Sequence, residues 1–149
     1  MTDLVVREAS GDDLEGLLRL YSHLHPDEPA IEPAMADRIW AELLATEWTT
    51  VLVAELEGAL VSTCTLTLVP NLTRGGRPYG LIENVVTDPG HQRRGFGRAV
   101  LAEAAAVAGS HDAYKMMLAT GSRRESTLAF YESAGFTRNG RTFFEIRRL

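Results

Sequence analysis

The sequence predicts an α/β (α+β) fold, a single domain over residues 1–149 with a mixed, mostly antiparallel central sheet flanked by helices. Six short runs rich in β-branched and apolar residues are typical of strands, and four segments are typical of helices, two of them because apolar residues recur at helical spacing. The length of 149 residues and a hydrophobic fraction of 45% suit one compact core. Together these features predict the order β-α-α-β-β-β-α-β-α-β.

The N-terminal half of the chain predicts two helices and three strands. In order, these are a strand Leu4–Arg7, a helix capped by Ser10 or Asp12 that ends at His23, a helix Ala34–Thr46, and two strands Thr49–Glu55 and Ala59–Val69. The turn at Glu57 and Gly58 predicts that these two strands form an antiparallel hairpin. Residues 25–33 hold three prolines and several acids, so we expect a linker that cannot continue the first helix.

The C-terminal half predicts three strands and two helices after a loop at residues 71–80. In order, these are a strand Leu81–Thr87, a helix Arg98–Ala108, a strand Lys115–Ala119, a helix Glu125–Ser133 and a strand Phe143–Arg147. The first of these strands is short, apolar and β-branched, and an Asp-Pro-Gly turn follows it. We therefore expect this strand to be buried.

Composition and charge exclude several function classes. A formal net charge of −5 disfavours a nucleic-acid binder that relies on its overall field. Cys64 is the only cysteine, which excludes an internal disulfide and a thiolate metal cluster and makes a reducing cytoplasm the simplest compartment. Charged residues at Asp3, Arg7 and Glu8 interrupt any secretory signal, and no apolar run approaches membrane-spanning length. We expect a soluble protein that binds neither nucleic acid nor membrane.

A glycine-rich turn joins the buried strand to the following helix. Gly95 and Gly97 stand where that helix begins, and Arg93, Arg94 and Arg98 add positive charge. The free backbone N–H groups of a helix N-terminus attract anions, and glycine lets an anion approach the main chain. One interpretation is a phosphate or pyrophosphate site, and the alternative is a turn that uses glycine only for its backbone freedom.

Two motifs carry a family resemblance. Residues 92–97 read Gln-Arg-Arg-Gly-Phe-Gly, and Leu128–Phe136 passes from helix to strand and ends in Tyr-x-x-x-Gly-Phe. With these motifs in this order, the chain resembles the GNAT superfamily of N-acetyltransferases over nearly its whole length. Within the superfamily, Leu81–Val86 and the second motif look most like the glucosamine-6-phosphate N-acetyltransferase branch.

The resemblance implies a GNAT-like fold and acetyl-CoA as co-substrate, with direct transfer of the acetyl group to a primary amine of a small molecule or peptide. Arg124 occupies the position at which many members place an asparagine that holds the pantetheine arm. Arg123 and Arg124 either form a solvated turn or contact the phosphates of CoA. The residues for which the resemblance predicts cofactor contacts are Val85, Val86, Thr87, Gln92, Arg93, Arg94, Gly95, Phe96, Gly97, Arg98, Arg124 and Phe130.

Two residues are candidates for acid–base catalysis of acetyl transfer. Glu83 is a carboxylate in an otherwise apolar strand, so it is either the general base, directly or through water, or a structural or substrate-binding group. Tyr131 has a phenol whose ordinary pKa of about 10 suits protonation of a leaving thiolate, and its alternative is an ordinary core tyrosine. Strand alternation directs Asn84 to the opposite face, unless a bulge intervenes, and favours a structural role.

The remaining reactive side chains carry weaker predictions. We expect the four histidines, at positions 23, 25, 91 and 111, to be solvated, and we expect no metal site. Nothing supports Cys64 as a nucleophile, since it lies near neither motif. The acids of the linker are usually only solvent-facing, but the resemblance implies that the linker walls the acceptor site, which would favour a cationic substrate.

Two functions therefore stay open at this point, a catalytic N-acetyltransferase and a non-catalytic acyl-CoA binding or sensing domain. Retention of both Glu83 and Tyr131 favours catalysis, because a binder needs only the glycine loop. Members of the resembled branch often pair through their C-terminal strands, and the apolar run 143–146 makes a homodimer the expectation. The sequence does not identify the acceptor amine.

Overall fold

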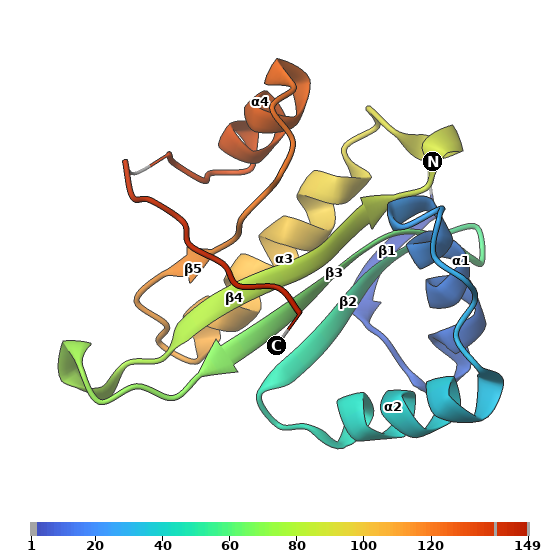
Figure 1. Cartoon of the computed structure of the whole chain (residues 1–149), viewed down its shortest axis with the longest axis horizontal. Helices are drawn as coiled ribbons and strands as arrows, with labels where there is room; N and C mark the ends of the chain where they lie inside the picture. Colours follow the sequence, from blue (N-terminus) through green and yellow to red (C-terminus); the bar gives the residue numbers. More distant parts are fainter. Residues whose placement is uncertain (1–2, 139, 149) are drawn as a thin grey trace.

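Five strands form one sheet in the order β1-β2-β3-β4-β5 in a computed structural model that describes residues 3–138 and 140–148 (Figure 1). The strands are β1 (Leu4–Glu8), β2 (Thr49–Leu56), β3 (Ala59–Val69), β4 (Tyr79–Thr87) and β5 (Met116–Met117). Neighbours are antiparallel from β1 to β4, and β5 runs parallel to β4. This mixed sheet with helices around it confirms the predicted fold class.

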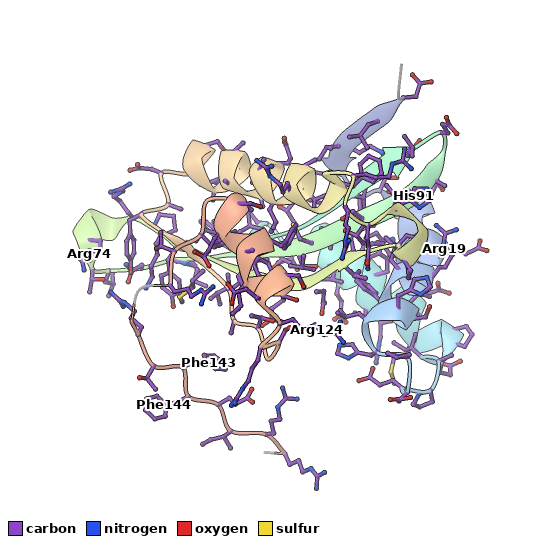
Figure 2. All side chains as sticks on the ribbon, turned by 90° about the horizontal axis from the view of Figure 1, so that it is seen from above. Arg19, Arg74, His91, Arg124, Phe143 and Phe144 are labelled. Carbon is purple, nitrogen blue, oxygen red and sulfur yellow. The ribbon has the colours of Figure 1, made fainter. Side chains whose placement is uncertain are left out.

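The helices cover both faces of the sheet. They are α1 (Leu14–Leu24), α2 (Pro33–Ala45), α3 (Phe96–Ser110) and α4 (Glu125–Ser133). Figure 1 and Figure 2 show α3 on one face and α1 and α2 on the other. None of the helices in the described part of the chain has the length and apolarity needed to cross a membrane.

Strand alternation divides the core into two apolar layers. The layer toward α3 contains Leu52, Cys64 and Ile82 from the sheet, and Val100 and Leu101 from the helix, all buried. The layer toward α1 and α2 is a second cluster of buried residues, namely Leu17, Leu20, Trp40, Val51, Val53, Leu60 and Val86. Because successive side chains of a strand point to opposite faces, one sheet supports both layers.

The start of α1 is fixed by polar contacts. Ser10 and Asp13 form a capping box, in which the backbone N–H of Ser10 donates to the Asp13 carboxylate at 2.7 Å. Asp13 is buried, and the Arg7 guanidinium donates two hydrogen bonds to it, at 2.7 and 3.0 Å. Arg7 also donates to Glu55 on the neighbouring strand β2. Ser10, one of the two predicted candidates, thus caps the 3₁₀ turn Gly11–Asp13 that leads into α1, and the N-cap of α1 itself is Asp13.

The predicted hairpin of β2 and β3 is confirmed. Glu57 and Gly58 have φ values of 51° and 82°, and positive φ at both central residues is the geometry of a type I′ turn. This turn matches the right-handed twist of the strands that it joins, so it favours their antiparallel pairing.

Two predictions for the C-terminal half are corrected. The strand predicted at Lys115–Ala119 is limited to Met116–Met117, which pairs with the first residues of β4. The strand predicted at Phe143–Arg147 is wrong, because this segment forms no strand and its Phe144 and Ile146 side chains are 86% and 80% exposed. A strand needs a neighbouring backbone with which to pair, and the short β5 offers little.

Candidate active site

A β-bulge lies in the middle of β4. The register pairs Thr65 with Glu83 and Thr63 with Val86, so Cys64 alone faces two residues, Asn84 and Val85. Asn84 adopts a φ of 53°, a left-handed conformation that asparagine tolerates better than most residues. The bulge therefore interrupts the strand alternation on which the expectation for Asn84 depended.

The bulge sorts the candidate residues between the two faces of the sheet. Val85 packs against the layer toward α3, whereas Val86 belongs to the layer toward α1 and α2. Glu83 pairs directly with Thr65, so both side chains stand on the α1 and α2 face. The Glu83 side chain is exposed and has no hydrogen bond or ion pair with another described residue.

The outer edge of β4 is only partly covered by β5. The described pairing between these strands stops at Leu81 and Met117, and no strand of the described chain pairs with that edge of β4 from Ile82 to Thr87. Backbone groups along this edge, around the bulge, are available to a ligand. The predicted cofactor residues Val85, Val86 and Thr87 lie on this stretch.

The glycine turn opens α3 as predicted. Gly95 is the N-cap with a φ of 85°, and its left-handed conformation favours glycine. Gly97 is buried, and a Cβ atom at this position would lie 2.9 Å from Cζ of Phe130 and 3.2 Å from Oγ1 of Thr87. Gly97 is therefore required by the contact between the first turn of α3 and α4, in addition to any role beside an anion.

Arginines surround this helix start without an acidic partner. Arg93, Arg94 and Arg98 are exposed, and no ion pair joins them to a described carboxylate. The guanidinium of Arg94 lies over the ring of the buried Phe96, with Cζ 5.0 Å from the ring centroid. Gln92 is exposed in the same loop. The loop thus presents unpaired cations beside free backbone N–H groups.

Arg124 stands at the N-cap of α4 and is exposed. Its backbone N–H donates to the Ser122 hydroxyl at 3.3 Å, and no ion pair in the described chain involves its guanidinium. Phe130, on the same helix, contacts Tyr131 edge to face at 5.0 Å between ring centroids.

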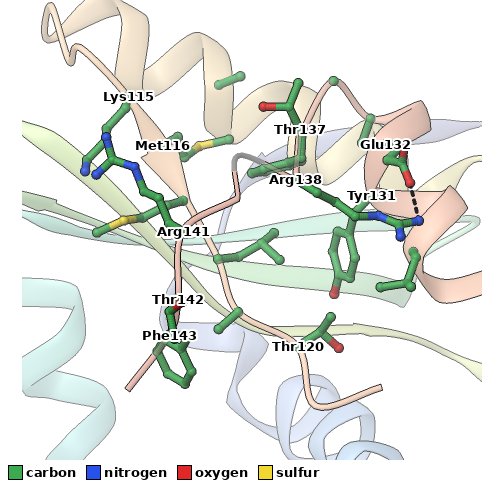
Figure 3. A pocket seen from close by; sticks show the side chains of 18 residues that line it. Lys115, Met116, Thr120, Tyr131, Glu132, Thr137, Arg138, Arg141, Thr142 and Phe143 are labelled. Atoms are coloured by element: carbon green, nitrogen blue, oxygen red, sulfur yellow. Dashed lines mark hydrogen bonds and ion pairs between the residues drawn. The ribbon is translucent and has the colours of Figure 1, made fainter. Parts of the chain in front are cut away.

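Tyr131 lines a cavity of about 790 Å³ between β5, α4 and the segment 141–143 (Figure 3). The tyrosine is partly buried and packs against the layer toward α3, and burial raises the pKa of its phenol above 10.0. The phenol is therefore protonated at neutral pH and can donate a proton. Figure 3 shows its hydroxyl directed into the cavity.

The cavity also carries cations that sequence reasoning missed. Lys115 and Arg141 line it, and neither has an acidic partner among the described residues. The Lys115 ammonium lies 5.8 Å from the centroid of Tyr79 and 5.5 Å from that of Tyr114. Arg138 is also in the lining, but Glu132 and Glu125 neutralise it. Lys115 lies in a segment that was predicted only as a strand, and Arg141 lies in a segment without a motif, so neither was predicted as a site residue.

Two histidines lie beside the carboxylate of Asp88, and of these His23 is exposed, as expected, whereas His91 is partly buried. His91 Nδ1 lies 2.7 Å from the Asp88 carboxylate, and His23 Nε2, at the end of α1, lies 3.6 Å from it. The hydrogen bond from His91 lowers the pKa of Asp88, and the backbone N–H of Gly90 adds to this effect. In the part of the chain that the structure describes, no group of three His, Cys, Asp or Glu residues could hold a metal ion.

Cys64 is fully buried at the bulge, and burial raises its pKa to about 12. A thiol is nucleophilic only as the thiolate, so this side chain is unsuited to covalent catalysis. Its sulfur lies 3.6 Å from the carbonyl oxygen of Val100, which ties β3 to α3. The prediction that Cys64 is no nucleophile agrees with this burial.

Comparison with known proteins decides the family. Residues 15–136 match the family model of the acetyltransferase (GNAT) family. The chain belongs to this family. Glucosamine 6-phosphate N-acetyltransferase of Trypanosoma brucei brucei is 32% identical over 136 residues, which are 91% of this chain and 90% of the relative.

Solved structures extend the comparison. One from Agrobacterium tumefaciens strain C58 matches with a TM-score of 0.92 at 44% identity, covering 97% of this chain and 99% of that chain. Glucosamine-6-phosphate N-acetyltransferase from Arabidopsis thaliana matches with a TM-score of 0.85 at 20% identity, covering 97% and 99%, and at this identity shares the fold alone. The GNAT resemblance and the assignment as an acyltransferase are confirmed, and acetyltransferases of this family use acetyl-CoA.

Proposed function

We propose that this chain is an acetyl-CoA-dependent N-acetyltransferase that transfers the acetyl group directly to a primary amine, as one domain acting in the cytoplasm. The observation that carries the proposal is the bulge in β4, which lies on a stretch of strand edge that β5 does not cover. Glu83 stands beside this edge on the α1 and α2 face of the sheet, and Tyr131 packs against the layer toward α3. A pure acyl-CoA binder would need neither side chain.

The proposed cofactor site fits the residues of the glycine turn. The pyrophosphate of acetyl-CoA would bind the backbone at residues 93–98, where α3 begins and unpaired arginines stand. The pantetheine arm would run along the free edge of β4 at Val85 and Val86, and an N–H of this edge would stabilise the oxyanion. Arg124 and Phe130 would border the same site from α4.

Glu83 and Tyr131 have separate roles in this proposal. The amine nitrogen forms a bond to the acetyl carbonyl carbon, and its proton passes to Glu83 directly or through water. The carbon–sulfur bond breaks, and the Tyr131 hydroxyl gives its proton to the departing thiolate. Tyr131 is suited to this step because burial keeps its phenol protonated.

We propose an amino sugar phosphate, glucosamine 6-phosphate, as the acceptor. The named function of the Trypanosoma relative supports this choice. The positions of the charged groups also support it. Tyr79 and Glu83 share one face of β4 and lie about 13 Å apart along the strand. The Lys115 ammonium lies over the ring of Tyr79, so a positive charge stands at the far end of this face from Glu83. A phosphate could therefore meet Lys115 and Arg141 while the amine meets Glu83.

The test follows release of free CoA thiol from acetyl-CoA in the presence of single amines. The panel holds glucosamine 6-phosphate, glucosamine, a polyamine, an amino acid and a peptide. We expect the highest kcat/KM for glucosamine 6-phosphate, and we expect Lys115→Gln to raise KM for this amine but not for glucosamine. Absence of thiol release with every amine, although acetyl-CoA binds, would favour the acyl-CoA binding domain instead.

We also propose a homodimer that covers the C-terminal apolar residues. Phe143, Phe144 and Ile146 are 67%, 86% and 80% exposed, and a monomer would leave all three in water. Sedimentation at micromolar concentration should give twice the mass of the 16.3 kDa chain. A variant with serine in place of Phe143 and Phe144 should sediment as a monomer, and a parent chain that is monomeric would contradict the proposal.

A further inference from the structure

A row of hydroxyl groups lies beside Glu83 on the α1 and α2 face of the sheet. Thr63 and Thr65 are two residues apart on β3, so both point to this face. Thr65 stands directly opposite Glu83 on β4, and Thr63 stands opposite Val86. Side chains of directly opposed residues in an antiparallel pair lie about 5 Å apart at Cβ, so Thr65 is the nearest strand neighbour of Glu83.

Tyr21 brings a third hydroxyl to this row from α1. Its ring is partly buried in the layer that contains Trp40 and Val53. Burial raises the pKa of this phenol, and hydrogen-bonding contacts of its oxygen with Thr65 and Thr63 oppose that shift. Tyr21 is therefore a neutral hydroxyl with one proton to donate.

The Thr63 hydroxyl already has an acceptor for its proton. Thr63 is fully buried, and its hydroxyl donates to the carbonyl oxygen of Leu52 at 2.7 Å. Since a threonine hydroxyl has one proton, the capacity that Thr63 has left toward Tyr21 is that of an acceptor. The Tyr21 phenol can then give its proton to Thr63, and its oxygen can accept a proton from Thr65.

Thr65 stands opposite Glu83 in the register of the sheet. We propose that Thr65 gives its own proton to Tyr21 and that Thr65 Oγ1 accepts a hydrogen bond from the acceptor amine, with Tyr21 as the positioning residue that fixes this polarity. The inference rests on the proposed function. A neutral primary amine has two N–H groups and one lone pair. With one N–H on Glu83 and the other on Thr65, the lone pair is the part left to attack the acetyl carbon.

The test compares Thr65→Val, which keeps the shape and removes the hydroxyl, with Thr65→Ser, which keeps the hydroxyl. Loss of one orienting hydrogen bond of about 1–2 kcal/mol corresponds to a fall in kcat of roughly 5- to 30-fold. We expect that fall in Thr65→Val with little change in the Kd for acetyl-CoA, and we expect Thr65→Ser to restore most of kcat. Tyr21→Phe should lower kcat less, because Thr65 keeps its oxygen but loses its fixed direction.

Thr67→Val is the matched control. Thr67 is the next threonine on the same face of β3, and its hydroxyl contacts that of Thr49 at 3.2 Å, away from Glu83. This variant should retain the kcat of the parent chain. An unchanged kcat in Thr65→Val, or an equal fall in Thr67→Val, would overturn the role of Thr65. Because the parent chain is assayed beside the variants, that result would leave its own acetyl transfer, and hence the proposed function, in place.

Discussion

Gly97 on α3 and Phe130 on α4 are in such close contact that a methyl group on Gly97 would lie 2.9 Å from Cζ of the phenyl ring. The same methyl group would lie 3.2 Å from the Thr87 hydroxyl oxygen. The proposed phosphate turn is thus also the place where α4 docks against α3. Packing at this point couples the position of Tyr131, the next residue on α4, to the turn.

Gly97→Ala should therefore destabilise the chain by about 1 kcal/mol, since overpacking outweighs the gain in helix propensity. Phe130→Leu in the same chain should recover part of this loss, because the shorter side chain makes room. Urea denaturation of the two single variants and the double variant measures the coupling. Gly95→Ala is the control, because nothing lies within 4 Å of its Cβ position and its cost comes from a φ of 85°. Phe130→Leu should not rescue that variant, and equal rescue of both would exclude the contact as the cause.

The second prediction concerns Arg7, which joins β1, β2 and the start of α1. Replacement by methionine would leave the buried Asp13 carboxylate with only the hydrogen bonds of Ser10. The expected loss in the free energy of unfolding at pH 7 is on the order of 2 kcal/mol. Arg138→Met is the control, because its ion pairs with Glu125 and Glu132 are exposed, and it should change stability little.

The contribution of Arg7 should depend on pH. Hydrogen bonds from Arg7 lower the pKa of Asp13 below its ordinary 3.8, so the folded state favours the carboxylate. The stabilisation is complete above pH 3.8 and is lost as the pH falls through the lower pKa of the folded state. Urea midpoints of the parent chain and Arg7→Met should converge toward pH 2. A constant difference from pH 7 to pH 2 would contradict the assignment.

The sequence predicted the parts of the fold that depend on local patterns. The spacing of apolar residues located α1 and α2, and the Ala, Leu and Glu content located α3. The positive φ values at Glu57 and Gly58 match the short turn that was predicted there, and Gly58 is the residue type that favours this conformation. The bulge at Asn84 was not predicted, because the extra residue exists only relative to the register of β3. The segment Phe143–Arg147 has strand composition, but a strand forms only where a partner backbone is available.

In the candidate site, too, the parts that depend on local motifs were predicted and the parts that depend on tertiary contacts were not. The glycine turn and Tyr131 are marked by motifs, so their neighbourhood was predictable from the chain alone. The contact of Tyr21 with Thr63 and Thr65 joins α1 to β3 across more than forty residues, and no local pattern indicates it. The contact between Lys115 and Tyr79 depends likewise on the parallel pairing of β4 with β5.

Glu83→Gln should lower the rate of acetyl transfer most at low pH. There the amine is mainly ammonium, and a base must remove its proton before attack. Raising the pH supplies free amine and should restore part of kcat/KM, so the variant should have a steeper pH profile than the parent chain. Glu47→Gln, another exposed carboxylate, is the control and should follow the parent profile. A Glu83→Gln profile parallel to that of the parent would assign the base to another group, most simply an ordered water.

Tyr131→Phe should lower kcat by about 10²- to 10⁴-fold, the usual range for a general acid, with little change in the Kd for acetyl-CoA. The phenyl ring keeps the edge contacts with Phe130 and Phe136, so α4 should remain in place and the melting temperature should change little. Burial raises the pKa of the phenol above 10.0, and a raised pKa means that the protonated acid persists as the pH increases. The kcat of the parent chain should consequently show little loss from deprotonation of Tyr131 between pH 7 and pH 9. Steady-state kinetics over this range, with calorimetry for acetyl-CoA, measure both effects. A Tyr131→Phe variant with the kcat of the parent would remove the general-acid role, because the hydroxyl is the one group that the substitution deletes.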